Sequence, residues 1–300
     1  MDRRDALRFL GGAGAAAALP ALAQAAVNSR PVPASGERMP VIGLGTWITF
    51  DVGAAESPAR RARGEIMKAF FAAGGRLVDS SPMYGSSEAV IGAELARLRD
   101  APLFSATKVW TVGGLAGRRQ MEHSRGLWGV KRFDLMQVHN LLDWESHWPT
   151  LKAWKAEGRF RHIGMTTSHG RRHDDLAAIL KRDRLDFVQL TYNMADREVE
   201  ELLLPLAADR GAAVIVNRPF DGGALFGAKT QRPLPGWAAE LGCRTWAEAF
   251  LKWIAAHPAV TCAIPATSQL PHVQENMRAL SGPLPDAALR RRMLEDYEKA

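Results

Sequence analysis

The stretch RLVDSSPMYGSSEAVIGAELARLRDAPLFSATK, residues 76–108, sets the pattern that the rest of the chain repeats. Residues 76–79 form a short apolar run, and residues 103–108 form a second one, so both are typical of buried strands. Between them, residues 86–98 carry apolar side chains at helical spacing. Two strands joined by a helix predict a β-α-β unit with parallel strands.

Outward from this stretch, strand and helix patterns continue to alternate. Strands are expected at residues 41–47, 76–79, 103–108, 133–139, 161–166, 187–192, 213–217 and 260–265. Helices are expected at residues 58–73, 86–98, 118–128, 146–157, 172–181, 199–209, 245–256 and 271–280, with one more from residue 285. Eight such units in about 275 residues predict an α/β protein with a closed (β/α)8 TIM barrel.

An open doubly wound sheet is the alternative fold. It would need a glycine-rich turn directly after its first strand. Gly43 and Gly45 lie inside the first predicted strand instead, and no third glycine follows at the required spacing. The barrel is therefore the favoured architecture.

Composition limits the kinds of partner. Hydrophobic residues make up 47% of the chain and charged residues 24%, which suits one globular domain with a large core. The net charge of +7 is spread along the chain without an aromatic-interleaved basic stripe, so no nucleic-acid partner is expected. Cys243 and Cys262 lack metal-type spacing, and we expect neither a metal site nor a disulfide.

Residues 1–25 have the layout of a signal peptide: a charged start, a weakly apolar middle and a small-residue end at residues 23–25. The pair Arg3 and Arg4 resembles a twin-arginine signal. The sequence thus predicts export by the twin-arginine machinery to the periplasm or beyond, with residues 26–300 forming the barrel. The apolar run is interrupted by glycine and proline, so no stable membrane insertion is expected. The alternative is an extension that stays attached.

Four polar residues follow three neighbouring strands. Asp79, Lys108 and His139 each end a predicted strand, and Tyr84 comes five residues after the first of them. The carboxyl ends of barrel strands carry the active-site groups of this fold, so the four side chains are expected to meet on one face.

These side chains form a proton-transfer set. Addition of hydride to a carbonyl carbon leaves an alkoxide, and a tyrosine hydroxyl can donate the proton that it needs. A lysine cation lowers the pKa of a nearby tyrosine, an aspartate holds the lysine in place, and a histidine orients the carbonyl oxygen. The alternatives are structural roles for each residue taken singly, or a Schiff-base nucleophile at Lys108.

Several segments, read together, resemble the aldo-keto reductase family. The segments that carry the resemblance are MPVIGLGTW (39–47), VDSSPMYGSSE (78–88), ATKVW (106–110), DLMQVHN (134–140) and IGMTTS (163–168). The resemblance covers roughly residues 36–282, and the order and spacing of the four polar residues are its most specific part. It implies the catalytic roles just described for Asp79, Tyr84, Lys108 and His139.

The resemblance also implies an extended NADP(H) across the barrel mouth, favoured over NAD(H). The cofactor-binding positions that it implies are Thr166, Thr167, Gln189, Asn217, Pro265, Thr267, His272, Glu275 and Asn276. Two departures bear on the cofactor. Asn217 stands where many members have an aromatic residue, and Ala266 and His272 stand where basic residues often grip the 2′-phosphate.

Trp47 and Trp110 are expected to line the substrate pocket, with core packing as the alternative. The expected activity is reduction of a small carbonyl substrate by a monomeric enzyme. A nicotinamide-binding sensor or subunit of the same fold, with little turnover, is the alternative function.

Overall fold

The computed structural model describes residues 27–299, so the predicted signal peptide at residues 1–25 lies outside the described residues. Eight parallel strands follow one another around a sheet in chain order. They are β3 (Leu44–Gly45), β4 (Leu77–Asp79), β5 (Phe104–Val109), β6 (Phe133–Val138), β7 (Phe160–Thr166), β8 (Phe187–Thr191), β9 (Ala213–Asn217) and β10 (Val260–Ala263).

The first and last strands of this sheet close it into a barrel. The N–H of Gly43 donates to the carbonyl of Ala263 at 2.8 Å, and the N–H of Gly45 donates to the carbonyl of Pro265 at 3.0 Å. A Cβ on Gly45 would lie 2.7 Å from the carbonyl oxygen of Ile264, and one on Gly43 would lie 2.9 Å from that of Leu77. These two glycines therefore let the backbones approach closely, and the predicted (β/α)8 barrel is confirmed.

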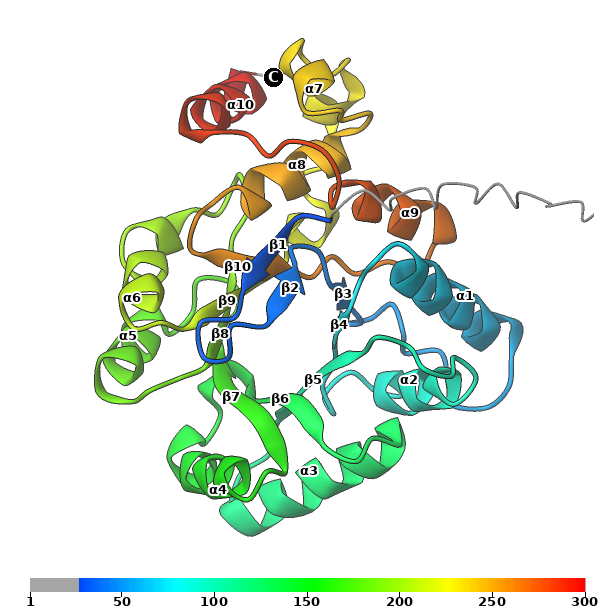
Figure 1. Cartoon of the computed structure of the whole chain (residues 1–300), viewed down its shortest axis with the longest axis vertical. Coiled ribbons are helices and arrows are strands. Elements are labelled where there is room, and N and C mark those ends of the chain that lie inside the picture. The colour runs from blue at the N-terminus through cyan, green and yellow to red at the C-terminus, as the bar shows by residue number, and fades with distance from the viewer. Residues whose placement is uncertain (1–26, 300) are drawn as a thin grey trace, which may run out of the picture.

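Helices surround the barrel (Figure 1). They are α1 (Pro58–Ala72), α2 (Ser87–Leu95), α3 (Gly114–Trp128), α4 (Trp144–Ala156), α5 (His173–Arg182), α6 (Leu203–Asp209), α7 (Trp237–Glu240), α8 (Trp246–Ala255), α9 (Leu270–Arg278) and α10 (Ala287–Lys299). Local sequence explains where some of them begin. The Ser57 hydroxyl accepts the N–H of Arg60 ahead of Pro58, and the Thr245 hydroxyl accepts that of Glu248, so both helices have an N-cap.

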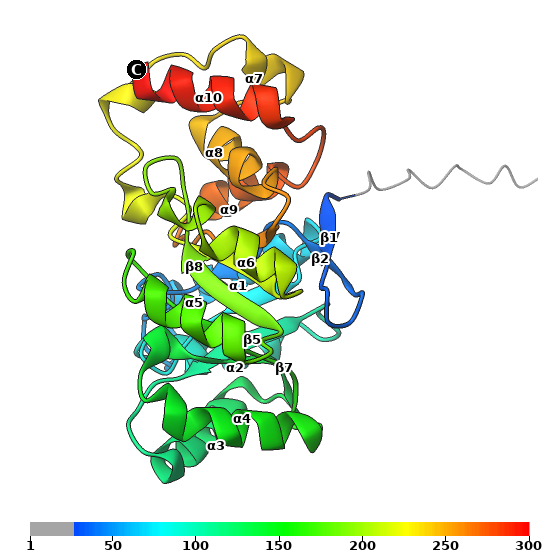
Figure 2. The same ribbon diagram turned by 90° about the vertical axis from the view of Figure 1, so that its left-hand side faces the viewer.

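Two parts of the helical layer differ from the sequence prediction. The expected helix at residues 199–209 is divided into a 3-10 turn, Glu198–Glu200, and α6. The short helix α7 was not predicted, and it packs beside α10, where Trp237 Nε1 donates to Asp296 at 2.9 Å (Figure 2). Four helical residues are too few to produce a readable apolar period, so α7 could not be predicted from the sequence.

Apolar side chains bury themselves in two separate clusters. The larger one fills the space between the strands and the helices. The smaller one fills the barrel interior and includes Leu77, Phe104, Phe187 and Ile264. Cys243 and Cys262 are both buried and free, as expected.

A β-hairpin covers the amino end of the barrel. It consists of β1 (Ser29–Pro31) and β2 (Arg38–Pro40), paired antiparallel, and it crosses the barrel opening in Figure 1. Val32 and Met39 of this hairpin are fully buried in the interior cluster. The sequence analysis missed it because three-residue strands show no clear alternation. With this end filled, a ligand has access from the opposite end. Within residues 27–299, no helix is long and apolar enough to cross a membrane.

Candidate active site

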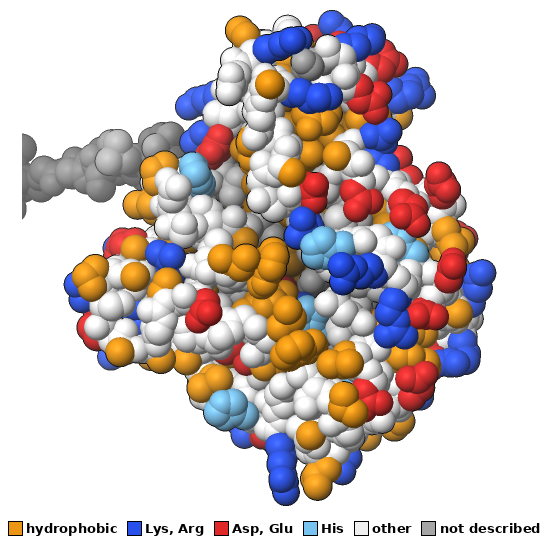
Figure 3. Space-filling view, turned by 180° about the vertical axis from the view of Figure 1, so that it is seen from behind, with side chains coloured by type: hydrophobic (Ala, Val, Ile, Leu, Met, Phe, Trp, Pro, Cys, Tyr) orange, Lys and Arg blue, Asp and Glu red, His pale blue; other side chains and the backbone are white. Residues whose placement is uncertain are grey.

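The carboxyl ends of the strands surround a cavity of about 1000 Å³. It lies on the face opposite the hairpin, and Figure 3 shows it with hydrophobic side chains along one side and basic ones along the other. Asp79, Tyr84 and His139 line this cavity. The structure thus brings together three of the four residues expected to meet here, and the fourth, Lys108, lies directly behind them.

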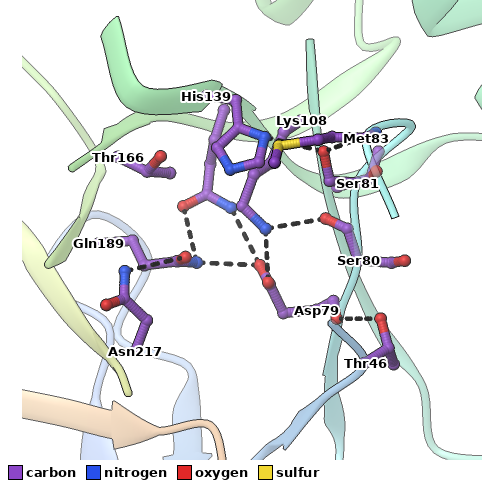
Figure 4. Close-up of polar contacts among 12 residues, drawn as sticks. Thr46, Asp79, Ser80, Ser81, Met83, Lys108, His139, Thr166, Gln189 and Asn217 are labelled. Carbon is purple, nitrogen blue, oxygen red and sulfur yellow. Dashed lines mark hydrogen bonds and ion pairs between the residues drawn. The ribbon is translucent and has the colours of Figure 1, made fainter. Parts of the chain in front are cut away.

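Lys108 and Asp79 form a buried ion pair. Lys108 Nζ donates to Asp79 Oδ2 at 2.5 Å and to the carbonyl of Ser80 at 2.8 Å (Figure 4). Both side chains are removed from solvent, with 0% of Lys108 and 2% of Asp79 exposed. Burial by itself lowers the pKa of Lys108, but the facing Asp79 carboxylate and Tyr84 outweigh it and raise that pKa. The lysine is therefore a fixed cation.

The second carboxylate oxygen of Asp79 is also occupied. Asp79 Oδ1 accepts the side-chain amides of Gln189 at 2.9 Å and Gln137 at 3.2 Å. The main-chain carbonyl of Asp79 accepts the hydroxyl of Thr46 at 2.9 Å. Asp79 of β4 thereby links Thr46, the residue after β3, with strands β5, β6 and β8, and this network fixes the carboxylate that holds Lys108 (Figure 4).

Tyr84 lies between Lys108 and His139. Lys108 Nζ is 5.1 Å from the centre of the Tyr84 ring, and the Tyr84 and His139 rings meet edge to face at 5.7 Å. The lysine cation lowers the pKa of Tyr84, as the sequence argument required. Burial is the largest influence and raises the pKa of Tyr84, and the Asp79 carboxylate raises it further. The net pKa of Tyr84 therefore lies above its ordinary value. Tyr84 consequently keeps its proton at neutral pH.

His139 is a neutral imidazole. Burial, together with repulsion from the Lys108 cation, lowers the pKa of His139 to about 2. Its Nδ1 lies 2.9 Å from the hydroxyl of Ser81, a fully buried residue. A neutral histidine has one N–H donor, and a protonated tyrosine has one O–H donor. The site can therefore present two uncharged donors to one ligand oxygen.

Most of the cofactor-binding positions implied by the sequence line the same cavity. Those that do are Thr166, Thr167, Gln189, Asn217, Thr267, His272, Glu275 and Asn276. Pro265 does not line it, although its neighbours Ile264 and Ala266 do. The positions extend from the end of β7 to α9, so they come from both sides of the cavity.

Asn217 is held within the wall of this cavity. Its side-chain nitrogen donates to the carbonyl of Thr167 at 2.9 Å, and its oxygen accepts the hydroxyl of Thr191 at 2.7 Å. The Thr167 hydroxyl is buried and has no hydrogen-bond partner in the described part of the chain. Thr167 itself lines the cavity, so this unsatisfied hydroxyl belongs to the layer of residues next to any bound ligand.

The two expected pocket tryptophans have different positions. Trp47 lines the cavity and is 41% exposed, together with the exposed apolar side chains of Ile48 and Met83. Trp110 is equally exposed but is not among the residues that line the cavity. Neither tryptophan is packed in the core, so core packing, the alternative considered from the sequence, is wrong for both.

Sequence reasoning did not single out Thr46, Ser81 or Gln137. One signal was present for Gln137, which is a polar residue inside an otherwise apolar, fully buried strand segment. Ser81 and Thr46 offered no such signal because hydroxyl residues are common in turns and at strand ends. Only the three-dimensional arrangement shows what they contact.

Comparison with known proteins gives a consistent set of matches. The model of the Aldo/keto reductase family matches residues 41–291. The NADH-specific methylglyoxal reductase of Escherichia coli is 29% identical over 231 residues, which are 66% of this chain and 68% of that protein.

Solved structures match over most of the chain. An aldo/keto reductase from Klebsiella pneumoniae in complex with NADP and acetate is 25% identical with a TM-score of 0.73, over 86% of this chain and 93% of that one. The holo form of an aldo-keto reductase from Bacillus halodurans is 23% identical with a TM-score of 0.73, over 90% of this chain and 96% of that one, a likeness of fold.

Proposed function

The chain belongs to the aldo/keto reductase family, and from this premise we propose that it catalyses the reversible reduction of an aldehyde or ketone to the alcohol, with Tyr84 as the proton donor. The observation that carries the proposal is the buried Lys108–Asp79 pair beside Tyr84 and His139 in the wall of the cavity. A binding protein has no need for all four groups.

Tyr84 is protonated at neutral pH and can act as a general acid. Because its pKa lies above the ordinary value, the phenol carries its proton when the carbonyl substrate arrives. The Lys108 cation stabilises the phenolate that forms when the proton has been transferred. His139, being neutral, donates to the carbonyl oxygen without competing as an acid.

A nicotinamide cofactor would supply the hydride to the carbonyl carbon. The residues present fit such a group: polar side chains line the cavity from Thr166 to Asn276, and the Thr167 hydroxyl among them is buried without a hydrogen-bond partner in the described part of the chain. Thr166, Thr167 and Gln189 would hold the carboxamide, and Thr267, His272, Glu275 and Asn276 the adenosine end. Pro265 is not proposed as a cofactor contact, because it does not line the cavity and its carbonyl already accepts the N–H of Gly45.

The proposed cofactor is NADP(H) in preference to NAD(H). His272 is the one basic side chain among the implied adenosine-end positions. It lines the cavity and is exposed to solvent. The name of the Escherichia coli relative states NADH specificity for that protein. The ratio of kcat/KM for NADPH to that for NADH tests this preference.

The function is tested by following the oxidation of NADPH and of NADH with methylglyoxal and with an aromatic aldehyde. Turnover that disappears in Tyr84→Phe is the expected result. Tight cofactor binding without turnover of any carbonyl would favour the nicotinamide-binding sensor or subunit. A protein–substrate adduct trapped by borohydride and lost in Lys108→Met would instead favour a Schiff-base enzyme.

We further propose that the protein is exported in the folded state by the twin-arginine machinery and cleaved before Ala26. Arg3, Arg4 and the small residues 23–25 support this. Replacing Arg3 and Arg4 together by lysine is expected to leave uncleaved protein in the cytoplasm. Cell fractionation and mass spectrometry measure its location and its mass. Normal export of this variant would contradict the proposal. Deletion of residues 1–25 is expected to preserve activity, because the barrel described above begins after them.

A further inference from the structure

Ser81 lies in the loop between β4 and α2, directly beneath the catalytic side chains. It is fully buried, whereas Met83, two residues later, is 40% exposed at the cavity. The Ser81 hydroxyl oxygen accepts the N–H of Met83 at 3.2 Å and lies 2.9 Å from His139 Nδ1 (Figure 4). This hydroxyl is therefore placed between the backbone that leads to Tyr84 and the imidazole that faces the cavity.

The contacts determine which partner donates to the other. A backbone N–H can only donate, so the Met83 contact uses an acceptor position of the hydroxyl and leaves its proton free. Among the residues described, His139 Nδ1 is the remaining partner of the Ser81 hydroxyl. If Nδ1 carried the proton, Ser81 would accept twice, and its own O–H would be buried without an acceptor. Ser81 therefore donates, and Nδ1 accepts.

The consequence is a fixed tautomer. A neutral imidazole that accepts at Nδ1 carries its proton at Nε2. Burial and the Lys108 cation keep His139 neutral, so the doubly protonated imidazolium is not formed at neutral pH.

Resting on the proposed function, we propose that Ser81 is a positioning residue that holds His139 as its Nε2–H tautomer, so that the imidazole donates to the carbonyl oxygen beside Tyr84. In the other tautomer, Nε2 would present a lone pair to that oxygen and repel it. The main-chain carbonyl of Ser81 also accepts the N–H of Tyr84 at 2.9 Å. One residue thus orients both donors.

A purely structural role for Ser81 makes different predictions. Its contact with the Met83 N–H is a short-range turn, and loss of this turn alone would loosen the loop without changing the tautomer of His139. The experiment must therefore read the tautomer as well as the rate. Ser80→Ala is the matched control, because the Ser80 hydroxyl is equally buried and has no partner in the described part of the chain.

The tautomer is measured by long-range ¹H–¹⁵N NMR on histidine-labelled protein, with the His139 signal assigned from a His139→Gln variant. The wild-type protein and Ser80→Ala are expected to show Nε2–H, and Ser81→Ala a mixture containing Nδ1–H. Ser81→Thr, which keeps a hydroxyl, is expected to restore Nε2–H. An Nδ1–H signal in the wild-type protein would overturn the proposal. Because this measurement uses the wild-type protein, it tests the proposal even if Ser81→Ala folds poorly.

The kinetic test is a double-mutant cycle with methylglyoxal as the probe. Ser81→Ala is expected to lower kcat and kcat/KM together by about 10- to 100-fold, less than the loss of a whole oxyanion donor, with cofactor affinity within about twofold. In the His139→Gln background, Ser81→Ala is expected to cause no further loss. An equal loss in both backgrounds would show that Ser81 acts through the loop. Absence of wild-type turnover would reject the proposed function, while the tautomer measurement would still test the Ser81 contact.

Discussion

The two ends of the barrel each carry a cluster of charged side chains, and the clusters differ in how they meet solvent. At the carboxyl end, Lys108 and Asp79 are 0% and 2% exposed. At the amino end, Glu37 of the hairpin pairs with Arg76 at 2.7 Å and with Arg161, and the two arginines are 32% and 29% exposed. Arg161 also contacts Asp134 of β6 at 2.8 Å.

The same ion-pair chemistry has different consequences at the two ends. A desolvated pair surrounded by amide donors changes the proton affinity of its neighbours, and here the neighbours are Tyr84 and His139. A partly solvated network instead ties the hairpin to the strands beneath it. In barrel enzymes, chemistry belongs to the carboxyl end and stability to the amino end. Variants at each end should therefore separate rate from stability.

The largest expected effect comes from Tyr84→Phe at the carboxyl end. Removing the proposed general acid should lower carbonyl reduction by about 10²–10⁴-fold while cofactor affinity and melting temperature stay close to the wild-type values. Steady-state kinetics and fluorescence titration of the cofactor measure this. Tyr297→Phe on α10, away from the cavity, is the control. Full activity in Tyr84→Phe would remove Tyr84 from the proton-donor role.

Lys108→Met should have the next largest effect, about 10- to 100-fold on the rate. Without the cation the pKa of Tyr84 rises further above its ordinary value, so the alkaline limb of the pH–rate profile should move to higher pH. Asp79 would remain buried without its cation and destabilise the fold, and adding Asp79→Asn should restore stability but not activity. An alkaline limb at the wild-type position would show that Lys108 does not tune Tyr84.

His272→Arg, on the opposite side of the same cavity, should change specificity rather than rate. An arginine can bind a phosphate bidentately, so the ratio of kcat/KM for NADPH to that for NADH should rise about tenfold. Gln274→Arg is the matched control, since Gln274 is exposed on the same helix α9 and is not among the residues that line the cavity. An equal change in both variants would indicate a general effect of charge.

Arg161→Met at the amino end should have the smallest effect on activity. It should lower the free energy of unfolding by about 1 kcal/mol, the upper end for solvated ion pairs, and leave kcat unchanged. Denaturant unfolding measures the loss, and Arg61→Met, which breaks one exposed pair with Glu56, is the control. A reduced kcat in Arg161→Met would contradict the separation of the two ends.

The stabilisation by the Glu37–Arg161 pair depends on pH through the ionisation of Glu37. Burial raises the pKa of Glu37, but Arg161 and Arg76 outweigh it, and the folded value lies below the ordinary 4.5. A lowered folded pKa means that the stabilisation is complete above pH 4.5 and is lost as the pH falls through the folded value. The difference in stability between wild type and Arg161→Met should therefore shrink in acid.

Local patterns in the sequence were sufficient to predict the barrel and the group of polar residues at its carboxyl end. Strand and helix periods repeat within a few residues. Asp79, Lys108 and His139 each end a predicted strand, and Tyr84 comes five residues after the first of them. In a parallel barrel the carboxyl ends of the strands meet by necessity, so the four residues were brought together without knowledge of any contact.

Only the tertiary structure determined the contacts between residues that are far apart in the chain. Gln189 and Asp79 are separated by 110 positions, and Ser81 and His139 by 58, yet each pair shares a hydrogen bond. The hairpin over the amino end and the net direction of the Tyr84 pKa belong to the same class. The physical reason is that burial, packing and hydrogen-bond pairing depend on which side chains the closed barrel places next to one another, and no local period in the sequence encodes that.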